Sequence, residues 1–545
     1  MTTATATVSA DHGAAIQRFR RLAPTLVAAV FAAAYVILSP ASLDLADHLF
    51  RAQLFRDEGF GLWNNLWYSG HHIVGYSVLF PAVSALLSPQ LAGALAATGT
   101  AALFEPLARR HFGAGAWLGA VLLGAATAID LYTGRLAFAF GALPALAAVV
   151  ALDRDRVALA CGLALLSALC SPVAALFAAL IAAGYSLGAL WRARRLAPAL
   201  PAASVAVAAL APVGLLAVAF PEGGSEPFGF PTMFPVLILA ALALATAPPG
   251  STTLRAGIVI YALATISVYM IHSPIGSNIA RLGTFLAAPV AALLWAQRRP
   301  RLLTVAILPL LYLGWAAPVR DVVSVSNDPS ASTGYYQPVL RFLRRQAAAV
   351  GPPFRTEIPF TRFHWEAWVV ASHFPLARGW ERQLDIADNP LFYRGRLTAA
   401  AYKRWLHANA IRFVVAPDAP LDYSAQREMA LIDRGLPFLD LVMRSPHWRM
   451  YEVDHATPIA SGAATLTGLG PDWLTLRARR PGTVRLHVRF TPYWKLTGGS
   501  GCVAPDGRWT RLTLLKAGPI RLETSFSLSR IRATSPRCTS SSTPN

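Results

Sequence analysis

The feature of this sequence that most constrains its fold is a series of apolar stretches, each about as long as a membrane crossing. A helix needs roughly 20 mostly apolar residues to span the hydrocarbon core of a bilayer. Pro81 and Pro89 should divide the longest stretch into an interfacial piece and a crossing helix, and Ser171-Pro172 should separate two short ones. We therefore expect an α-helical polytopic membrane protein with about eleven hydrophobic helices, over residues 23–40, 76–108, 114–131, 136–152, 157–171, 173–191, 198–219, 232–248, 256–272, 279–296 and 302–318.

Composition supports lipid as the main solvent of this chain. Of its 545 residues, 55% are hydrophobic and only 14% are charged, too few polar groups to coat a globule of this size. The net charge of +20 comes from dispersed basic residues, without runs or interleaved aromatics, which is not the pattern of a nucleic-acid-binding surface. We expect the lipid bilayer, and no nucleic acid, as a partner.

The arginines between the apolar stretches predict the orientation of the chain. They concentrate in alternate loops, on the same side as Arg18, Arg20 and Arg21 of the N-terminal segment, whereas the opposite short loops hold few basic residues. The excess of positive charge usually marks the cytoplasmic face. The N-terminus is therefore expected in the cytoplasm and the loop of residues 42–75 outside. The arginine-rich loops are those with Arg109 and Arg110, Arg154 and Arg156, Arg192, Arg194 and Arg195, Arg255, and Arg298, Arg299 and Arg301.

The composition also predicts the domains. Residues 1–22 form a polar cytoplasmic tail and 23–319 the transmembrane domain. After residue 319 charge rises and apolar runs shorten. Because the N-terminus is expected in the cytoplasm and the number of crossings is odd, this region is expected outside the cytoplasm. Residues 320–457 suggest an α/β domain, with helices over Pro338–Val350 and Thr398–Asn409 and strands over Phe354–Phe360 and Arg412–Ala416.

The last part of the chain has the pattern of a β-sandwich. Short alternating runs between turn signals cover residues 458–533, including Trp473–Ala478, Val484–Phe490 and Ile520–Phe526, as expected for a sandwich-like module. Residues 534–545 are rich in Ser, Thr and Pro and are expected to be disordered. A disulfide between Cys502 and Cys538 is permitted outside the cytoplasm, but the sequence leaves it open.

The loop of residues 42–75 carries a density of ionisable groups found nowhere else in the first three hundred residues. If a helix begins at Asp44, then Asp47, His48 and Arg51 follow at i+3, i+4 and i+7, on one face. These groups could supply a general base for an acceptor hydroxyl, or Asp44 and His48 could bind a divalent cation, Mg²⁺ or Mn²⁺. Alternatively, an aspartate caps an interfacial helix and Asp47 pairs with Arg51.

Three further charged residues flank other outer loops. Asp130 and Arg135 could pair with each other as a structural salt bridge, or Asp130 could join the 42–75 loop while Arg135 meets an anionic ligand. Arg281 precedes a span, within HSPIGSNIARLG, where a guanidinium could bind a phosphate through two hydrogen bonds. The alternative for Arg281 is an interfacial arginine that snorkels to water.

Aromatic and imidazole side chains complete the 42–75 loop. Trp63, Trp67 and Tyr68 would suit stacking against a sugar, yet they also suit the usual interfacial aromatic belt. His71 and His72 could contact the substrate or bind a metal, although adjacent histidines more often serve local hydrogen bonding.

Four short motifs carry a resemblance to a known group of proteins. They are Asp44-x-x-x-His48-Leu49, Trp63-Asn64, Tyr68-Ser69-Gly70 and Leu79-Phe80-Pro81. Together they resemble the first outer loop of bacterial membrane proteins labelled 6-pyruvoyl-tetrahydropterin synthase-related and of the similar YfhO-like proteins. These in turn look like the GT-C class of glycosyltransferases, in which an acidic residue of the first outer loop is catalytic.

The resemblance implies a function. It implies a GT-C-like enzyme of the bacterial plasma membrane, with the carboxylate of Asp44 as a catalytic group that orients or deprotonates an acceptor hydroxyl. The donor would be a polyprenyl-phosphate sugar and the acceptor an envelope glycan or protein on the extracytoplasmic face. Two other functions stay open, namely a transporter or flippase of lipid-linked sugars and a non-catalytic scaffold for envelope assembly.

Overall fold

The structure is a computed structural model that describes residues 2–351, 353–395 and 397–539. The chain divides into two compact units. Unit 1 comprises residues 1–45, 76–215 and 225–324, and unit 2 comprises residues 46–75, 216–224 and 325–545.

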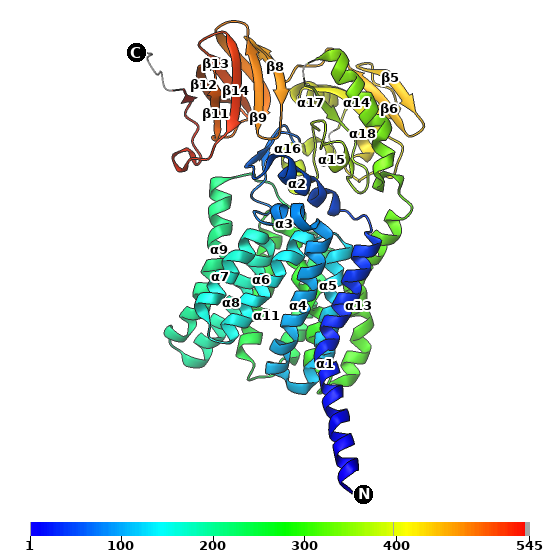
Figure 1. The fold of residues 1–545 in the computed structure, drawn as a ribbon, viewed down its shortest axis with the longest axis vertical. Helices are drawn as coiled ribbons and strands as arrows, with labels where there is room; N and C mark the ends of the chain where they lie inside the picture. Colours follow the sequence, from blue (N-terminus) through cyan, green and yellow to red (C-terminus); the bar gives the residue numbers. More distant parts are fainter. Residues whose placement is uncertain (1, 352, 396, 540–545) are drawn as a thin grey trace. The chain divides into compact units, whose positions relative to one another are not determined.

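Unit 1 is a bundle of apolar helices (Figure 1). Among the described residues, eight stretches are long and apolar enough to cross a membrane; the longest, Pro89–Tyr132, contains two helices, and two shorter apolar helices raise the number to eleven. The protein is therefore a multi-pass membrane protein, and the expected number of helices is confirmed. The helices are α1 (Thr2–Leu38), α4 (Pro89–Phe112), α5 (Trp117–Tyr132), α6 (Leu136–Asp153), α7 (Val157–Cys170), α8 (Pro172–Ala193), α9 (Leu200–Ala219), α10 (Phe230–Thr246), α11 (Thr252–Met270), α12 (Ala280–Trp295) and α13 (Pro300–Val325).

Prolines and serines set the breaks between consecutive helices. The short helix α3 (Phe80–Leu87) ends before Ser88, whose hydroxyl accepts a hydrogen bond from the Leu91 amide at the start of α4. Ser171 caps α8 in the same way, accepting from the Ala174 amide. Proline follows each of these serines and fits the first turn of a helix because its missing N–H needs no partner there. Both breaks fall where the sequence predicts them.

The bundle leaves large apolar side chains on its outside. Along α13, Val305, Leu308 and Tyr312 are 76%, 73% and 71% exposed. Such a surface would be unstable in water but is suited to lipid. The outer faces of the helices therefore agree with the membrane assignment from their length.

The first part of unit 2 after α13 is an α/β domain. Its four-stranded sheet has the order β3 (Arg355–Glu357), β4 (Ile411–Pro417), β6 (Trp448–Val453) and β5 (Leu439–Ser445), with β3 parallel to β4 and the other pairs antiparallel. The predicted helices appear as α14 (Gln337–Val350) and α17 (Ala399–Ala408), and the predicted strands as β3 and β4. The remaining helices are α15 (Glu366–Val369), α16 (Arg382–Asp388) and α18 (Gln426–Asp433).

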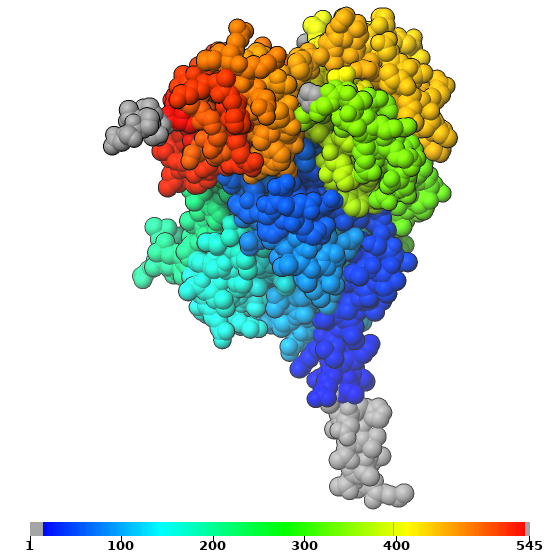
Figure 2. Space-filling view, turned by 45° about the horizontal axis from the view of Figure 1, so that its top comes forward, coloured from blue at the N-terminus to red at the C-terminus, as the bar shows by residue number. Residues whose placement is uncertain are grey.

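The second part of unit 2 is a sandwich of two antiparallel sheets. In Figure 2 it forms the orange-to-red lobe beside the green-to-amber α/β domain. Alternate residues such as Leu474, Leu476 and Val484 are buried between the sheets, as their period-2 pattern requires. One sheet orders as β15 (Arg537–Cys538), β12 (Gly501–Asp506), β13 (Trp509–Leu514), β10 (Gly482–Arg489) and β7 (Ala460–Gly462), the other as β11 (Trp494–Gly498), β14 (Gly518–Thr524), β9 (Trp473–Ala478) and β8 (Ala464–Leu469).

The structure departs from the expected domain limits in three places. Helix α13 continues to Val325, and residues 46–75 belong to unit 2 with the C-terminal domains. The segment expected as a cytoplasmic tail is helical from Thr2 as the first part of α1, and its place in the cytoplasm stays a prediction.

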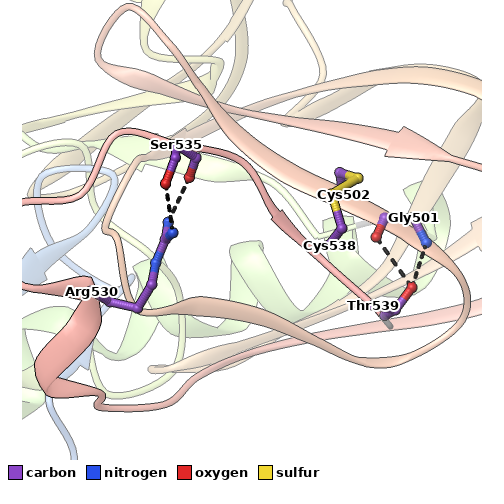
Figure 3. Close-up of a disulfide and its surroundings, with 6 residues drawn as sticks. All are labelled: Gly501, Cys502, Arg530, Ser535, Cys538 and Thr539. Atoms are coloured by element: carbon purple, nitrogen blue, oxygen red, sulfur yellow. Dashed lines mark hydrogen bonds between the residues drawn. A yellow bond between two sulfur atoms is a disulfide. The ribbon is translucent and has the colours of Figure 1, made fainter. Parts of the chain in front are cut away.

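The third departure concerns the C-terminal tail. Within the tail expected to be disordered, Arg537–Cys538 pairs with β12, while residues 540–545 lie outside the described residues. A Cys502–Cys538 disulfide joins these two strands (Figure 3). Thr539 and Gly501 add hydrogen bonds beside it, so the chain is anchored to the sandwich up to that point.

Candidate functional site

A close backbone approach in unit 1 brings two separate loop segments together. Gly134, in the turn between α5 and α6, has a positive φ of +78°. A Cβ atom there would collide with the Ser42 hydroxyl and lie 3.0 Å from the Leu45 amide nitrogen. Only glycine allows both this conformation and this contact. The turn that separates Asp130 from Arg135 therefore packs directly against the segment that contains Asp44.

Four charged side chains gather around this contact, and we call them the acid–arginine cluster: Asp44, Asp130, Arg135 and Arg281. The Asp130 carboxyl is buried, 4.0 Å from Arg135 Nη1, and is within electrostatic range of Asp44 and Arg281. The Arg281 guanidinium lies over the Phe138 ring, 5.8 Å from its centre. Two acids and two cations from four different parts of the helix bundle thus share one region.

The electrostatic surroundings of this cluster include two groups that the sequence analysis did not assign to the site. Tyr76 is within electrostatic range of Arg281. Arg135 is within electrostatic range of Asp321, near the end of α13. Asp321 is buried, and its closest ion pair is with the exposed Arg320 at 3.6 Å. The signal for Asp321 was present in the sequence, because a carboxylate at the end of an apolar span needs a reason.

The other acidic and basic residues of the 42–75 loop belong to unit 2. Helix α2 (Leu45–Glu58) begins after Asp44. Within it Asp47 and Arg51 are buried and bonded, Arg51 Nε donating to Asp47 Oδ1 at 2.6 Å. Arg51 also donates to Glu381 and, at 3.3 Å, to the Ile73 carbonyl oxygen. The alternative that Asp47 pairs with Arg51 is therefore confirmed, and the catalytic roles expected of Asp47 and His48 stay predictions.

A second set of ionisable groups surrounds this pair, and we call Asp47, Arg51, His71 and Glu381 the buried ion cluster. His71 Nε2 lies 3.8 Å from Glu381 Oε1. Burial raises the pKa of Asp47, and it raises the pKa of Glu381 to about 7 in spite of the opposing Arg51 charge. Burial and then Arg51 lower the pKa of His71 well below its usual value, so this imidazole is neutral at pH 7.

His48 lies next to this cluster and His72 has its own partners. His48 Nδ1 is 3.5 Å from Asp47 Oδ2. His72 Nδ1 lies 2.5 Å from Glu222 Oε1, and His72 Nε2 lies 3.0 Å from the Thr491 hydroxyl. Sequence reasoning found neither Glu222 nor Glu381, since both are more than a hundred residues away and nothing local marks them.

The aromatic residues of the loop lie in the interior of unit 2. Trp67 is fully buried, stacked on Phe50 with ring centres 4.3 Å apart, and its indole N–H donates to the Ala367 carbonyl. Trp63 belongs to the apolar core of the sandwich, and the Tyr68 hydroxyl donates to the Glu381 carbonyl. Their faces are occupied by protein, so sugar stacking by these rings stays a prediction that would need them to become exposed.

A metal site gains no support from the arrangement. Asp44 belongs to unit 1 and His48 to unit 2. Over the described residues, no group of three or more His, Cys, Asp or Glu side chains is placed to hold a metal ion. Binding of Mg²⁺ or Mn²⁺ stays a prediction of the sequence.

Comparison with known proteins finds similar solved structures. No protein-family model matches the chain, and no curated protein matches it. An oligosaccharyltransferase from Archaeoglobus fulgidus in the apo form is similar with a TM-score of 0.46 and 11% identity, over 74% of this chain and 70% of that one. The arabinofuranosyltransferase AftD from Mycobacteria gives 0.41 and 14%, over 91% of this chain and 60% of that one.

A third similar structure is the archaeal oligosaccharyltransferase AglB from Archaeoglobus fulgidus, in complex with an inhibitory peptide and a dolichol-phosphate. Its TM-score is 0.37 at 12% identity, over 74% of this chain and 70% of that one. These neighbours are glycosyltransferases by name, and none of the comparisons supports the pyruvoyl-tetrahydropterin or YfhO labels. This chain spans only 60% of the length of AftD.

Proposed function

We propose that this protein is a membrane glycosyltransferase that moves a sugar from a polyprenyl-phosphate donor to an envelope glycan or protein acceptor on the extracytoplasmic face of a bacterial plasma membrane. The observation that carries the proposal is the gathering of Asp44, Asp130, Arg135 and Arg281 in one region of an apolar helix bundle. Charges in such surroundings are costly and are usually retained for function.

Asp44 is proposed as the general base. Asp44 is partly exposed, whereas Asp130 is buried, so Asp44 is the carboxylate that an acceptor can reach. It would take the proton of the acceptor hydroxyl as the oxygen attacks the anomeric carbon. The bond from that carbon to the phosphate oxygen breaks, and the lipid phosphate leaves with the bonding electrons.

The two arginines are proposed to bind the phosphate. A guanidinium matches two phosphate oxygens and keeps its charge at any physiological pH. Arg281 and Arg135 would stabilise the negative charge that develops on the leaving group, and this contribution usually exceeds that of the base. Asp130 would act as a positioning residue that holds Arg135. A metal enters no step, and a dependence on Mg²⁺ or Mn²⁺ would appear as loss of turnover after chelation.

A glycan profile tests the proposal. A deletion strain should lack one sugar linkage of its envelope, and the wild-type gene should restore that linkage. Asp44→Asn should not restore it at equal protein abundance. Asp57→Asn is the matched control, because Asp57 is an exposed carboxylate in the same loop region.

The outcomes also separate the alternatives. If the deletion removes no linkage, the transferase function is wrong. If Asp44→Asn restores the linkage fully, Asp44 is not the base, and a flippase of lipid-linked sugars or a scaffold becomes the better explanation.

A further inference from the structure

Unit 1 contains a second feature that the proposed reaction does not use, a cavity of about 860 Å³ between its helices. This volume lies within the range of sites for small organic ligands. Its wall is formed mainly by side chains of α4, α6, α8, α10, α11 and α12, all of which are labelled in Figure 1 except α10 and α12. The wall includes Leu282 but, among the described residues, not its neighbour Arg281.

The two ends of the cavity differ in polarity. It extends along α8 from Ala174 to Arg192 and along α12 from Leu282 towards Gln297. At the first end the wall is apolar, with Phe138 and Phe177. At the other end it includes Arg192, Thr252, Thr253, Gln297 and Arg298. That end carries the arginine-rich loops, so the cavity is a long apolar chamber with a basic mouth.

The basic mouth is built by close packing of two helices. A Cβ atom at Gly188 of α8 would lie 2.7 Å from the Thr253 Cα of α11, and small residues of this kind let membrane helices approach. One turn further along α8, Arg192 Nη1 donates to the Thr252 hydroxyl at 2.9 Å and to the Thr253 hydroxyl at 3.4 Å. Hydroxyl groups position the guanidinium without neutralising it.

The Asp153 carboxylate lies near this mouth. Asp153 accepts from the Tyr185 hydroxyl at 3.2 Å and lies 2.8 Å from His111 Nε2, and both of these residues line the cavity. Asp153 also pairs with Arg110 at 3.2 Å. Its charge is therefore balanced by Arg110, and the positive charges of Arg192 and Arg298 remain in excess at the mouth.

We propose that this cavity binds one anionic glycerophospholipid from the leaflet on the arginine-rich side. A hydrocarbon chain would fill the apolar chamber, and the phosphate would lie at Arg192 and Arg298. Basic pockets between transmembrane helices are suited to such headgroups. This phosphate would lie at the arginine-rich end of the cavity, whereas the donor phosphate of the proposed reaction would lie at Arg281. The inference does not depend on that reaction.

The test is lipid retention by the full-length protein in detergent, measured by native mass spectrometry after titration with phosphatidylglycerol or phosphatidylcholine. We expect one retained phosphatidylglycerol at concentrations where phosphatidylcholine is not retained. The double variant Arg192→Gln, Arg298→Gln should lower retention roughly tenfold or more, since each arginine near a headgroup contributes to binding. Ala243→Phe, which places a ring in the chamber, should lower it without changing the charge.

The matched control is Arg194→Gln, Arg195→Gln, which removes two exposed arginines of the same loop that do not line the cavity. It should retain phosphatidylglycerol as the wild type does. Equal losses in the two double variants would indicate surface attraction alone and overturn the proposal. Equal retention of the two lipids, or full retention by a folded Ala243→Phe, would overturn it as well. Asp44→Asn should leave lipid retention unchanged, which separates this test from that of the transferase.

Discussion

Two groups of charged residues that come from neighbouring positions in the sequence have opposite characters in the structure. The buried ion cluster of unit 2 is closed to solvent: Asp47 and Arg51 are almost fully buried and bonded to each other at 2.6 Å, and Arg51 donates a second hydrogen bond to Glu381. The acid–arginine cluster of unit 1 is open to solvent: Arg135 and Asp44 are partly exposed, and Arg135 Nη1 lies 4.0 Å from Asp130 Oδ1. Only two residues separate Asp44 from Asp47 along the chain.

The contrast in burial distinguishes a structural charge from one that can react. A charge buried against an opposite protein charge is shielded from solvent, and removing one partner leaves the other buried and unpaired. A charge held near opposite charges at a distance can still bind a substrate. Variants of the first cluster should therefore change stability, and variants of the second should change turnover.

The largest effect is expected at Arg281. Arg281→Gln should lower turnover about 10²–10³-fold, as the loss of a group that stabilises developing charge does elsewhere, while protein abundance stays normal. Arg281→Lys should recover part of the loss. The measurement is release of polyprenyl phosphate from the lipid-linked donor, with the exposed Arg301→Gln as the control. Wild-type turnover in Arg281→Gln would remove the phosphate-binding role.

A large loss of stability is expected at Arg51. Arg51→Met leaves Asp47 and Glu381 buried without their cation, which should lower the free energy of unfolding by about 3–5 kcal/mol. Chemical unfolding in detergent measures this, and Arg56→Met, at an exposed position of the same helix, should change it by less than about 0.5 kcal/mol. If Arg51→Met and Arg56→Met are equally stable, the buried ion cluster does not stabilise the fold.

The pH dependence of stability gives a further test of the buried ion cluster, at Glu381. Its folded-state pKa is raised from 4.5 to about 7, so the folded state holds this proton more tightly than the unfolded state. Ionising the buried Glu381 carboxyl lowers the free energy of unfolding. This loss is absent below pH 4.5, grows as pH rises to about 7 and is constant above, reaching about 3 kcal/mol.

Glu381→Gln cannot ionise and removes that loss. The stability of the variant relative to the wild type should therefore increase between pH 5 and 7, as followed by unfolding at each pH. The lowered pKa of His71 makes stability fall as the pH drops below 6.5, which is the opposite pH dependence. His71 is present in both proteins, so its contribution cancels in the difference between their stabilities. A difference that does not change with pH would place the Glu381 pKa outside this window.

The smallest effect on stability is expected at Gly134. Gly134→Ala should cost about 1–2 kcal/mol for its left-handed backbone, and it should also lower turnover because the new methyl group displaces the Ser42–Leu45 segment. Gly113→Ala is the matched control, since Gly113 has φ +66° and nothing within 4 Å of its Cβ position. It should also lose stability, because its backbone conformation of φ +66° and ψ −152° favours glycine, and it should keep full turnover. Equal turnover in the two variants would mean that the contact does not position Asp44.

Much of the fold could be predicted from the sequence, because its signals are local. Apolar length gave the eleven helices, Ser88-Pro89 and Ser171-Pro172 gave their breaks, and the alternation of Trp473–Ala478 gave strand β9. The limits of the units were harder, since residues 46–75 belong with domains that lie more than 250 residues later in the chain.

The candidate site was predictable only in part, for the same reason. An unusual charge beside an apolar span marked Asp44, Asp130, Arg135 and Arg281, and the structure brings these four into one region. Helical spacing also grouped Asp47 with Asp44, because spacing takes no account of a distant partner. Glu381 is that partner, and it closes the Asp47–Arg51 pair from 330 residues away along the chain.

The most direct test of this account measures Asp44→Asn and Asp47→Asn side by side, each for sugar transfer per folded molecule and for free energy of unfolding. We expect Asp44→Asn to lose at least about 100-fold in transfer and to keep its stability, whereas Asp47→Asn should lose stability and keep transfer by the molecules that remain folded. The reverse pattern, or equal loss of transfer in both, would contradict it.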